Sequence, residues 1–516
     1  MLFNSLPFIF LFLPVTLAGF YFLQRTGRRE WVYLFLVAAS LVFYAVWNPP
    51  YVLLLVGSML GNYLCARWIE RRMQAGHKPG IALLAGILGN LAFLGYYKYA
   101  NFFVDTVNSV AGTDWTLAKI ILPLAISFYT LQQIAFLVDI ARGEVRTAGL
   151  FRFATFVIFF PQLIAGPIVH YKEMMPQFFG RAAGRFPAQN LTIGAAIFAI
   201  GLFKKTVIAD SAALFSSPVY AAARAGEAIS FADGWIAAIG FTIQVYFDFS
   251  GYSDMAIGLA RMFGVRLPLN FHSPLRAVSI TEYWRRWHMT LQRFIAAYIY
   301  QPMVLPLTRW AATRGLGKWP EFGATTALPL VIAFVIVGLW HGAAWTYVVF
   351  GLIHGVYLSI NEAWRLWRRK SRRKDPPGTG SIAFYHALTV AAVVFSNVMF
   401  RAETVGDAVT IWRAMVSPSA QALAAFWPDV PGDVFAKPTA LFLAAVVLIT
   451  FFPNTQQLMR RYGPALDFAR WAAVGRPAIS LVFRPTPAWA VAIGLILFLG
   501  LAFILRGATE FIYFNF

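Results

Sequence analysis

Residues 279–291 read SITEYWRRWHMTL and residues 335–345 read VIVGLWHGAAW, and each stretch places one histidine among aromatic or apolar residues. His341 in the second stretch follows a long apolar run and has glycine or alanine at several neighbouring positions, including Gly342. Small residues let a substrate or another backbone come close to the imidazole. A polar side chain at membrane depth is costly, so we expect a functional role for these histidines.

The first stretch predicts a helix over 281–298 with two different faces. The inward face would carry an aromatic and histidine stripe: Trp284, Trp287, His288, Leu291, Ile295 and Tyr298. The opposite face would carry Arg285, Arg286, Met289, Gln292 and Arg293. We therefore expect an arginine edge that faces water or a phosphate group.

Composition identifies an integral membrane protein. The 516 residues are 59% hydrophobic and only 13% charged, whereas a soluble domain carries about 25% charged residues. The 39 glycines and 28 prolines are compatible with broken or kinked membrane helices. The formal charge of +21 is best explained by cytoplasmic loops, which collect Lys and Arg. Only for Arg285 and Arg286 do we favour an anionic donor as the partner.

Cysteine and metal chemistry are not expected. Cys65 is the sole cysteine, so a disulfide within the chain is excluded and a cysteine-based metal site is not expected. The chain has no HExxH motif, and His288 and His341 lack an obvious third ligand, which argues against zinc.

Apolar runs predict about twelve membrane crossings, with both chain ends outside. The runs are 7–23, 31–48, 51–66, 80–97, 118–138, 190–208, 234–250, 324–340, 345–362, 382–400, 438–453 and 487–505. Residues 151–167 have basic loops on both sides and contain Pro161 and Pro167, which predicts a re-entrant or broken helix. We expect one membrane domain with N-terminal spans (1–145), a catalytic core with re-entrant segments (146–362) and C-terminal spans (363–516).

The two histidines suit acyl transfer from a thioester to an alcohol. An imidazole in an apolar setting stays unprotonated and can take a hydroxyl proton, so His341 is our candidate general base. The alternative is a packed core histidine. His288 could orient the acyl carbonyl, act as a second acid–base group, or simply end the aromatic stripe. His354 is expected to be a packed helix residue, and no G-x-S-x-G elbow indicates a serine nucleophile.

Residues 244–254 read QVYFDFSGYSD and place Asp248, Ser250 and Asp254 around a glycine at an expected span end. A helix break with carboxylates could bind an ion or relay protons, as in a transporter. A structural turn whose side chains satisfy freed backbone groups explains the pattern equally well, and we favour it. Lys204 and Lys205 are expected to reach the membrane interface.

Many segments together resemble the membrane-bound O-acyltransferase (MBOAT) family and, within it, the bacterial alginate O-acetyltransferase group. The segments are LPFIFLFLP (6–14), YYKYANF (96–102), ILPLAISFYTLQQIAFLVDIARGE (121–144), FFPQLIAGPIVHYKEM (159–174), GLFKKTVIAD (201–210), YFDFSGYSDMAIGLARMFG (246–264), ITEYWRRWHMTL (280–291) and GLWHGAAWTYVVFGLIHG (338–355). The resemblance departs at Ala296 and Ala297, where relatives commonly have an Arg-Asp pair, and at 302–310, which lacks glycines. The acceptor subgroup is therefore open.

The resemblance implies an all-α polytopic fold in which funnels from both membrane faces meet at the catalytic histidine. It assigns that role to His341 and matches His288 to the family's second histidine. Candidate donor-binding residues are Arg285, Arg286, Trp287, Trp340 and Tyr298. Candidate structural or tunnel-lining residues are Asp248, Ser250, Asp254, Glu282 and Gly342.

The resulting hypothesis is an inner-membrane O-acetyltransferase that acts on an exopolysaccharide or another cell-envelope glycan. The donor would be acetyl-CoA or an acyl-carrier thioester, with no permanently bound cofactor and no metal. Expected partners are membrane lipids, the glycan and a periplasmic acetyltransferase of the SGNH type, with no nucleic acid. The alternatives are a polysaccharide exporter or flippase that uses Asp248 and Asp254, and a non-catalytic assembly subunit.

Overall fold

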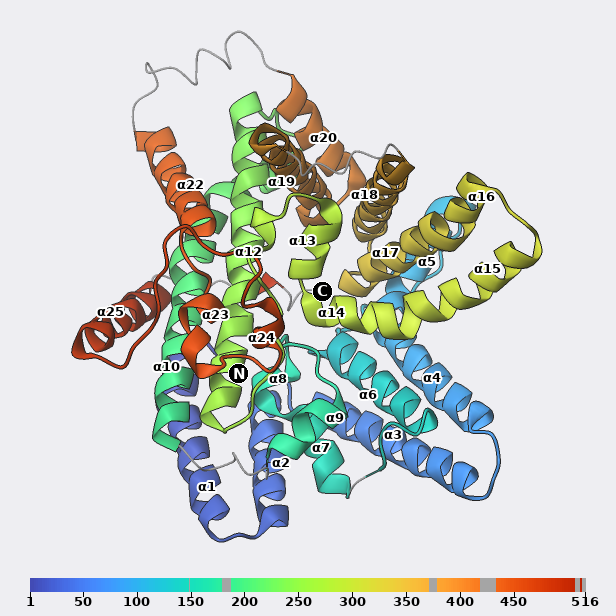
Figure 1. The fold of residues 1–516 in the computed structure, drawn as a ribbon, viewed down its shortest axis with the longest axis vertical. Helices are drawn as coiled ribbons and strands as arrows, with labels where there is room; N and C mark the ends of the chain where they lie inside the picture. Colours follow the sequence, from blue (N-terminus) through green and yellow to red (C-terminus); the bar gives the residue numbers. More distant parts are fainter. Residues whose placement is uncertain (148, 179–186, 371–377, 418–432, 506–510, 513–516) are drawn as a thin grey trace.

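The computed structural model describes residues 1–147, 149–178, 187–370, 378–417, 433–505 and 511–512. Every regular element in these ranges is a helix, and none of them is a strand. Figure 1 shows the long helix α12 (Phe231–Met262) running through the middle of the molecule, with α10 (Pro187–Phe203) beside it. The all-helical membrane class predicted from the sequence is confirmed.

Seven helical stretches of the described residues are long and apolar enough to cross a bilayer, which takes about 20 residues. They are Phe8–Arg25, Tyr51–Gln74, Gly80–Ala111, Ala188–Arg224, Lys318–His341, Thr379–Arg401 and Pro487–Ile504. Two shorter apolar helices, Ile126–Ala141 and Pro438–Phe451, add to them. The chain is therefore a multi-pass membrane protein, and the total of about twelve crossings stays a prediction.

The N-terminal helices form consecutive hairpins (Figure 1). They are η1 (Phe8–Phe12), α1 (Leu13–Arg25), α2 (Arg29–Ala45), α3 (Tyr51–Gln74), α4 (Gly80–Leu94), η2 (Gly95–Tyr99), α5 (Ala100–Ala111) and α6 (Ile126–Ala141). Helix α6 begins later than the run 118–138 predicted, because residues 112–123 are not helical. Ala125 adopts a φ of 63° directly before α6, and this left-handed residue turns the chain into the helix.

The break predicted within 151–167 is present. Helix α7 (Leu150–Ile158) stops at Phe159, whose φ of −52° and ψ of 109° are not helical, and the four-residue α8 (Phe160–Leu163) follows. The chain then continues without regular structure to α9 (Tyr171–Met174) and η3 (Met175–Gln177). The side chains from 153 to 170 are buried, so the protein itself covers this irregular backbone, as membrane depth requires.

Helix α10 continues through η4 (Lys204–Ala209) into α11 (Asp210–Arg224) and packs along α12 with backbone contact. A Cβ at Gly251 would lie 2.7 Å from the carbonyl oxygen of Gly201, and one at Gly258 would lie 2.6 Å from that of Gly194. Gly251 thus marks a helix contact within an uninterrupted α12. Both predictions for 244–254, a helix break and a structural turn at a span end, are wrong.

The single helix predicted over 281–298 is also wrong. Helix α13 (Ile280–Arg286) ends at Trp287, which is extended, and His288 has a φ of 44° before α14 (Met289–Ile295) starts. The chain then runs on as helical segments: η6 (Ala296–Tyr300), α15 (Gln301–Thr313), α16 (Lys318–Phe322), η7 (Gly323–Ala327), α17 (Leu328–His341) and α18 (Trp345–Lys370). Because the break resets the helical phase, residues on either side of it do not share one face.

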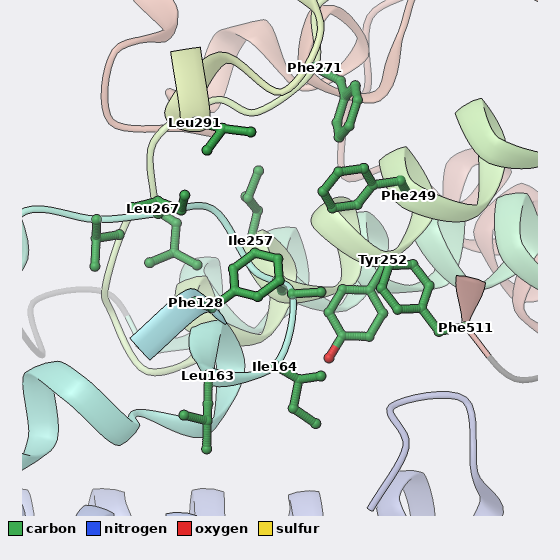
Figure 2. Packing of buried hydrophobic residues seen from close by; sticks show 14 of the residues in the cluster. Phe128, Leu163, Ile164, Phe249, Tyr252, Ile257, Leu267, Phe271, Leu291 and Phe511 are labelled. Carbon is green, nitrogen blue, oxygen red and sulfur yellow. The ribbon is translucent and has the colours of Figure 1, made fainter. Parts of the chain in front are cut away.

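The last third of the chain ends with Phe511 packed against the central helix α12. The helices of this third are α19 (Thr379–Arg401), α20 (Val405–Val416), α22 (Asp433–Phe451), α23 (Thr455–Leu458), η8 (Arg460–Tyr462), α24 (Phe468–Trp471) and α25 (Pro487–Ile504). One short element not yet named, η5 (Pro274–Arg276), lies between α12 and α13. Figure 2 shows Phe511 against Tyr252 of α12, with ring centroids 4.4 Å apart. One buried apolar cluster therefore joins the N-terminal residue Phe3 to Phe511.

Candidate active site

His341 is the last residue of α17, and backbone contact with the next helix fixes its position. Gly342 leaves the helix in an extended conformation, and the chain turns into α18 within a few residues. A Cβ at Gly338 would lie 2.1 Å from the carbonyl oxygen of Tyr347, and one at Gly342 would lie 2.0 Å from the ring of Tyr347. Gly338 therefore serves the close approach of another backbone, which was one of the two expected uses, and Gly342 makes room for the Tyr347 ring.

Two side chains from η2 hold the carbonyl end of α17. The ammonium of Lys98 donates a hydrogen bond to the carbonyl of Trp340, and the hydroxyl of Tyr99 donates to the carbonyl of Leu339 at 2.7 Å. Lys98 also donates to Ser127 Oγ at 3.1 Å and is buried. The last carbonyls of a helix have no partner within the helix, so these two donors satisfy groups that would otherwise be buried unpaired. They also attach the residues next to His341 to a neighbouring helix.

His288 lies in the break between α13 and α14 and is completely buried. Its Nδ1 is 3.0 Å from Oδ1 of Asn270, and its Nε2 has no hydrogen-bond partner among the described residues. The Trp340 ring lies next to both histidines, with centroids 5.8 Å from His288 and 5.0 Å from His341. The structure thus brings the two predicted histidines into contact with one tryptophan.

The space beside His341 is small. The cavity that His341 lines has a volume of about 10 Å³, roughly enough for one water molecule. It is lined by Val245, Tyr283, Trp284, Trp287, His341, Phe350, Asn397 and Phe400. A larger cavity of about 620 Å³ borders Gly342, and Lys98 and Asp105 line it as well. The tunnel that the resemblance implies stays a prediction, and aromatic side chains would have to move to admit an acyl group.

Of the two arginines that were expected to bind an anionic donor, the structure exposes only one. Arg285 faces outward, whereas Arg286 is buried and forms an ion pair with Glu282, one helical turn earlier. Glu282 also accepts a hydrogen bond from the backbone N–H of Val278 at 2.9 Å, so it stabilises the start of α13. The expected outward position of Arg286 is wrong, because its guanidinium pairs with Glu282 and packs against Gly475 of the last third of the chain. A donor-binding role for Arg285 stays a prediction.

The other candidate donor residues do not gather in one place. Trp287 packs on Tyr283 with ring centroids 5.7 Å apart and lines the small cavity with His341. Tyr298 instead donates a hydrogen bond to Asp139 at 2.6 Å and contacts His170 at 3.1 Å. Trp287 and Trp340 therefore lie at the histidines, while Tyr298 belongs to a separate polar contact.

The carboxylates of α12 are engaged in buried ion pairs. Asp248 lies 2.8 Å from Lys205 and accepts the backbone N–H of Ile512 at 3.1 Å. Asp254 lies 2.8 Å from Lys204 and accepts hydrogen bonds from Thr455 and Gln456, at 2.6 and 2.9 Å. Both lysines point into the protein, so the expectation that they reach the membrane interface is wrong. A buried charge needs a paired and hydrogen-bonded partner, and each carboxylate provides one.

Ser250 and His354, two further residues considered in the sequence analysis, are buried inside the protein. Ser250 is buried on α12, and its hydroxyl has no partner among the described residues. His354 is buried, and its Nδ1 accepts a hydrogen bond from the indole N–H of Trp284 at 3.1 Å. The expectation that His354 is a packed helix residue is confirmed. In the described ranges no three His, Cys, Asp or Glu side chains lie close enough together to hold a metal ion.

Three residues of the site were missed by the sequence analysis: Lys98, Asn270 and Asn397. Lys98 interrupts the apolar stretch LAFLGYYKYA, and a lone lysine at membrane depth is a signal that could have found it. Asn270 and Asn397 carry no comparable signal, because an asparagine near a span end is common. Only the fold brings them to the histidines.

Comparison with known proteins places this arrangement in a family. Residues 140–400 match the MBOAT, membrane-bound O-acyltransferase family. The chain belongs to this family. The range that matches the family contains both histidines and the whole of α12. His341, the candidate base of this membrane-bound O-acyltransferase, therefore lies in the part of the chain that is shared with the family.

The similar curated proteins are acyltransferases of several kinds. The chain is 38% identical to the peptidoglycan O-acetyltransferase of Helicobacter pylori, over 81% of this chain and 80% of that protein. It is 37% identical to the probable alginate O-acetylase AlgI of Pseudomonas aeruginosa, over 81% of this chain and 75% of that protein. The teichoic acid D-alanyltransferase of Streptococcus thermophilus is 27% identical over half of this chain. As a membrane-bound O-acyltransferase, the chain is an enzyme.

Proposed function

We propose that the protein transfers an acetyl group from a cytoplasmic thioester to a hydroxyl of a cell-envelope glycan, from a position in the bacterial inner membrane. The donor is acetyl-CoA or an acyl-carrier thioester. The acetyl group reaches the glycan directly or through a periplasmic SGNH-type acetyltransferase. The relatives named as peptidoglycan and alginate O-acetylating enzymes support an envelope glycan as the acceptor.

The observation that carries this function is the position of His341. The imidazole is 2% exposed, packs against the Trp340 ring that also contacts His288, and ends a helix whose last carbonyls are held in place. A fixed base in a water-poor site can remove a proton from a hydroxyl group without competing hydrolysis. The same burial means that the aromatic side chains around the small cavity must open for each turnover.

The chemistry needs no covalent enzyme intermediate. His341 accepts the proton of the acceptor hydroxyl while the hydroxyl oxygen attacks the thioester carbonyl carbon. The tetrahedral intermediate collapses, the carbon–sulfur bond breaks, and the proton passes from the imidazolium to the departing thiolate. The products are an O-acetyl ester and a free thiol, and the imidazole is neutral again.

The exporter or flippase hypothesis loses its support in the sequence. It relied on Asp248 and Asp254 at a helix break, but both carboxylates lie on a continuous helix and are paired with lysines. We therefore retain the acyltransferase as the one proposed function.

The test is transfer of radiolabelled acetyl from acetyl-CoA by the purified protein in lipid nanodiscs. Alginate and peptidoglycan oligosaccharides are offered as acceptors, with and without an SGNH-type acetyltransferase. We expect labelled sugar from the wild type and a loss of about 100-fold or more for His341→Ala, since general base catalysis contributes about that much. His77→Ala is the matched control, because this histidine is exposed and far along the chain from the site. Unchanged transfer by His341→Ala would contradict the proposed base.

A further inference from the structure

We propose that Asn270 is a positioning residue that fixes the tautomer of His288, with the hydrogen on Nδ1 and the lone pair on Nε2. The tautomer follows from hydrogen bonds within the protein. Its consequence for catalysis rests on the proposed function.

The His288 ring is held in one orientation. Its backbone has a φ of 44° and a ψ of 51°, a left-handed conformation that strains a non-glycine residue. The rings of Phe249 and Trp340 pack against the imidazole, with centroids 4.8 and 5.8 Å away. With the ring enclosed, Nδ1 stays 3.0 Å from Oδ1 of Asn270. Nε2 is buried and has no partner among the described residues.

The orientation of the Asn270 amide decides which atom faces the histidine. Thr290 contacts Oδ1 twice, through its hydroxyl at 2.9 Å and its backbone N–H at 3.5 Å, while Nδ2 donates to Ser253 Oγ at 3.0 Å. The Thr290 hydroxyl oxygen also accepts the N–H of Ile168 at 3.0 Å, so its own hydrogen is directed to Asn270. A flipped amide would place its NH₂ group against the Thr290 N–H, two donors facing each other. The oxygen therefore faces His288.

An oxygen that faces Nδ1 requires Nδ1 to carry the hydrogen. In a neutral imidazole the other nitrogen is then an acceptor. Of the two roles open to His288, donating a hydrogen bond to the acyl carbonyl is excluded for this neutral tautomer. Nε2 can instead accept a hydrogen bond or proton from a hydroxyl group. A partner that fixes the tautomer of a functional histidine is a general device in enzymes.

The backbone strengthens the same arrangement. The N–H of Met289 donates to the carbonyl of Asn270 at 2.9 Å, and the N–H of His272 donates to the carbonyl of Arg286 at 3.0 Å. These two bonds join the Asn270 segment to the break between α13 and α14. Asn270 and His288 therefore keep their separation without relying on the side chains alone.

The direct test is ¹⁵N NMR of the full-length protein in lipid bilayers with ¹⁵N-histidine, at about pH 8, above the ordinary imidazole pKa of roughly 6.5. His288→Asn identifies the resonance to be assigned, since asparagine tolerates the left-handed backbone. We expect the wild type to show His288 with hydrogen on Nδ1. In Asn270→Leu that preference should be lost. Hydrogen on Nε2 in the wild type would overturn the assignment.

Activity gives a second readout that a merely structural role would not move. Asn270→Asp keeps an oxygen acceptor for Nδ1–H, and the Ser253 hydroxyl can turn to donate to the new carboxylate. We expect kcat within about threefold of wild type for Asn270→Asp and at least about tenfold lower for Asn270→Leu, with KM for acetyl-CoA nearly unchanged. Equal losses in both variants would overturn the positioning role.

The matched control is Asn62→Leu. Asn62 is a buried asparagine on α3 whose amide donates to Asn90 at 3.1 Å, and the cavity that it lines borders neither histidine. It should lose stability as Asn270→Leu does but keep its turnover number. A wild-type protein with hydrogen on Nδ1 of His288 that transfers no acetyl to any acceptor would overturn the proposed function and leave the tautomer assignment standing.

Discussion

His341 and His288 both contact Trp340, but different contacts hold them. His341 ends a regular membrane helix whose backbone touches the next helix at Gly338, where a Cβ would be 2.1 Å from a carbonyl oxygen. His288 lies in a helix break and is held by side-chain hydrogen bonds through Asn270. The helix that ends at His341 is placed by this packing, and Lys98 and Tyr99 add hydrogen bonds only at its last carbonyls. A residue in a break instead needs polar partners to satisfy the freed backbone.

The difference predicts how each site can be damaged. Added volume should disturb the region of His341, because interiors are close-packed and cannot absorb an extra side chain. Loss of a hydroxyl or amide should disturb the region of His288, because its order depends on a few hydrogen bonds. The following variants test this contrast, from the largest expected effect to the smallest.

Gly338→Val should have the largest effect. The new side chain would overlap the carbonyl of Tyr347, so α17 and α18 must separate, and we expect a loss of about 3 kcal/mol or more in stability together with loss of transfer. Gly494→Val on α25 is the control, since nothing lies within 4 Å of a Cβ there. Thermal unfolding in nanodiscs measures the stability of both variants. A Gly338→Val protein as stable as the control would show that close packing of α17 on α18 is not what orders the region of His341.

Thr290→Val removes one hydroxyl from the His288 region without changing volume. The buried N–H of Ile168 loses its acceptor, so we expect a loss of about 1–3 kcal/mol in unfolding free energy and a smaller fall in turnover than for Asn270→Leu. Thr308→Val should change stability by less than about 0.5 kcal/mol, because Thr308 is exposed. Equal stability of the two variants would show that the polar contacts of His288 are not what orders it.

Lys98→Met separates stability from activity in the His341 region. Methionine fills the same space without the cost of a buried cation, so stability should change by only about 1 kcal/mol. The carbonyl of Trp340 loses its donor, and we expect turnover to fall about tenfold as the end of α17 gains freedom. Turnover assays and melting curves on one sample measure both. Wild-type turnover would mean that Lys98 does not position His341.

The smallest expected effect is on the pH dependence of stability, through His272, which lies outside the spanning helices. Burial, with Arg286 and Arg276 nearby, lowers the pKa of His272, while a hydrogen bond to the carbonyl of Val474 and the charge of Asp467 oppose the shift. Because the unfolded chain protonates this ring at a higher pH than the folded protein, stability is complete above about pH 6.5 and falls as the pH decreases below it. His272→Gln should lose less stability between about pH 7 and pH 5. Identical pH profiles would remove His272 as the cause.

Several features of the fold could be predicted from residue patterns alone. Apolar runs identified the membrane class and most helices, because lipid requires about 20 apolar residues for each span. Pro161 and the surrounding basic loops indicated the broken segment near 151–167. The motif around His341 indicated a candidate base, and that motif lies in the region that matches the family.

Other features could not be predicted, because they depend on contacts between distant residues. The pattern at 281–298 fits one helix, but His288 adopts a left-handed conformation there. Asn270, which lies 18 positions before His288 and 20 before Thr290, contacts both side chains. Gly251 looked like a break, but it is the point where α12 touches α10. Local periodicity carries no information on either contact.

The sequence by itself therefore determined that this chain spans a membrane, belongs to an acyltransferase class and carries two histidines in marked settings, because hydropathy and motifs are local properties. The tertiary structure alone decided which polar groups meet those histidines: Lys98 at the end of α17 and Asn270 at His288. A buried polar atom must find its partner wherever the fold supplies one, and that partner can come from any part of the chain.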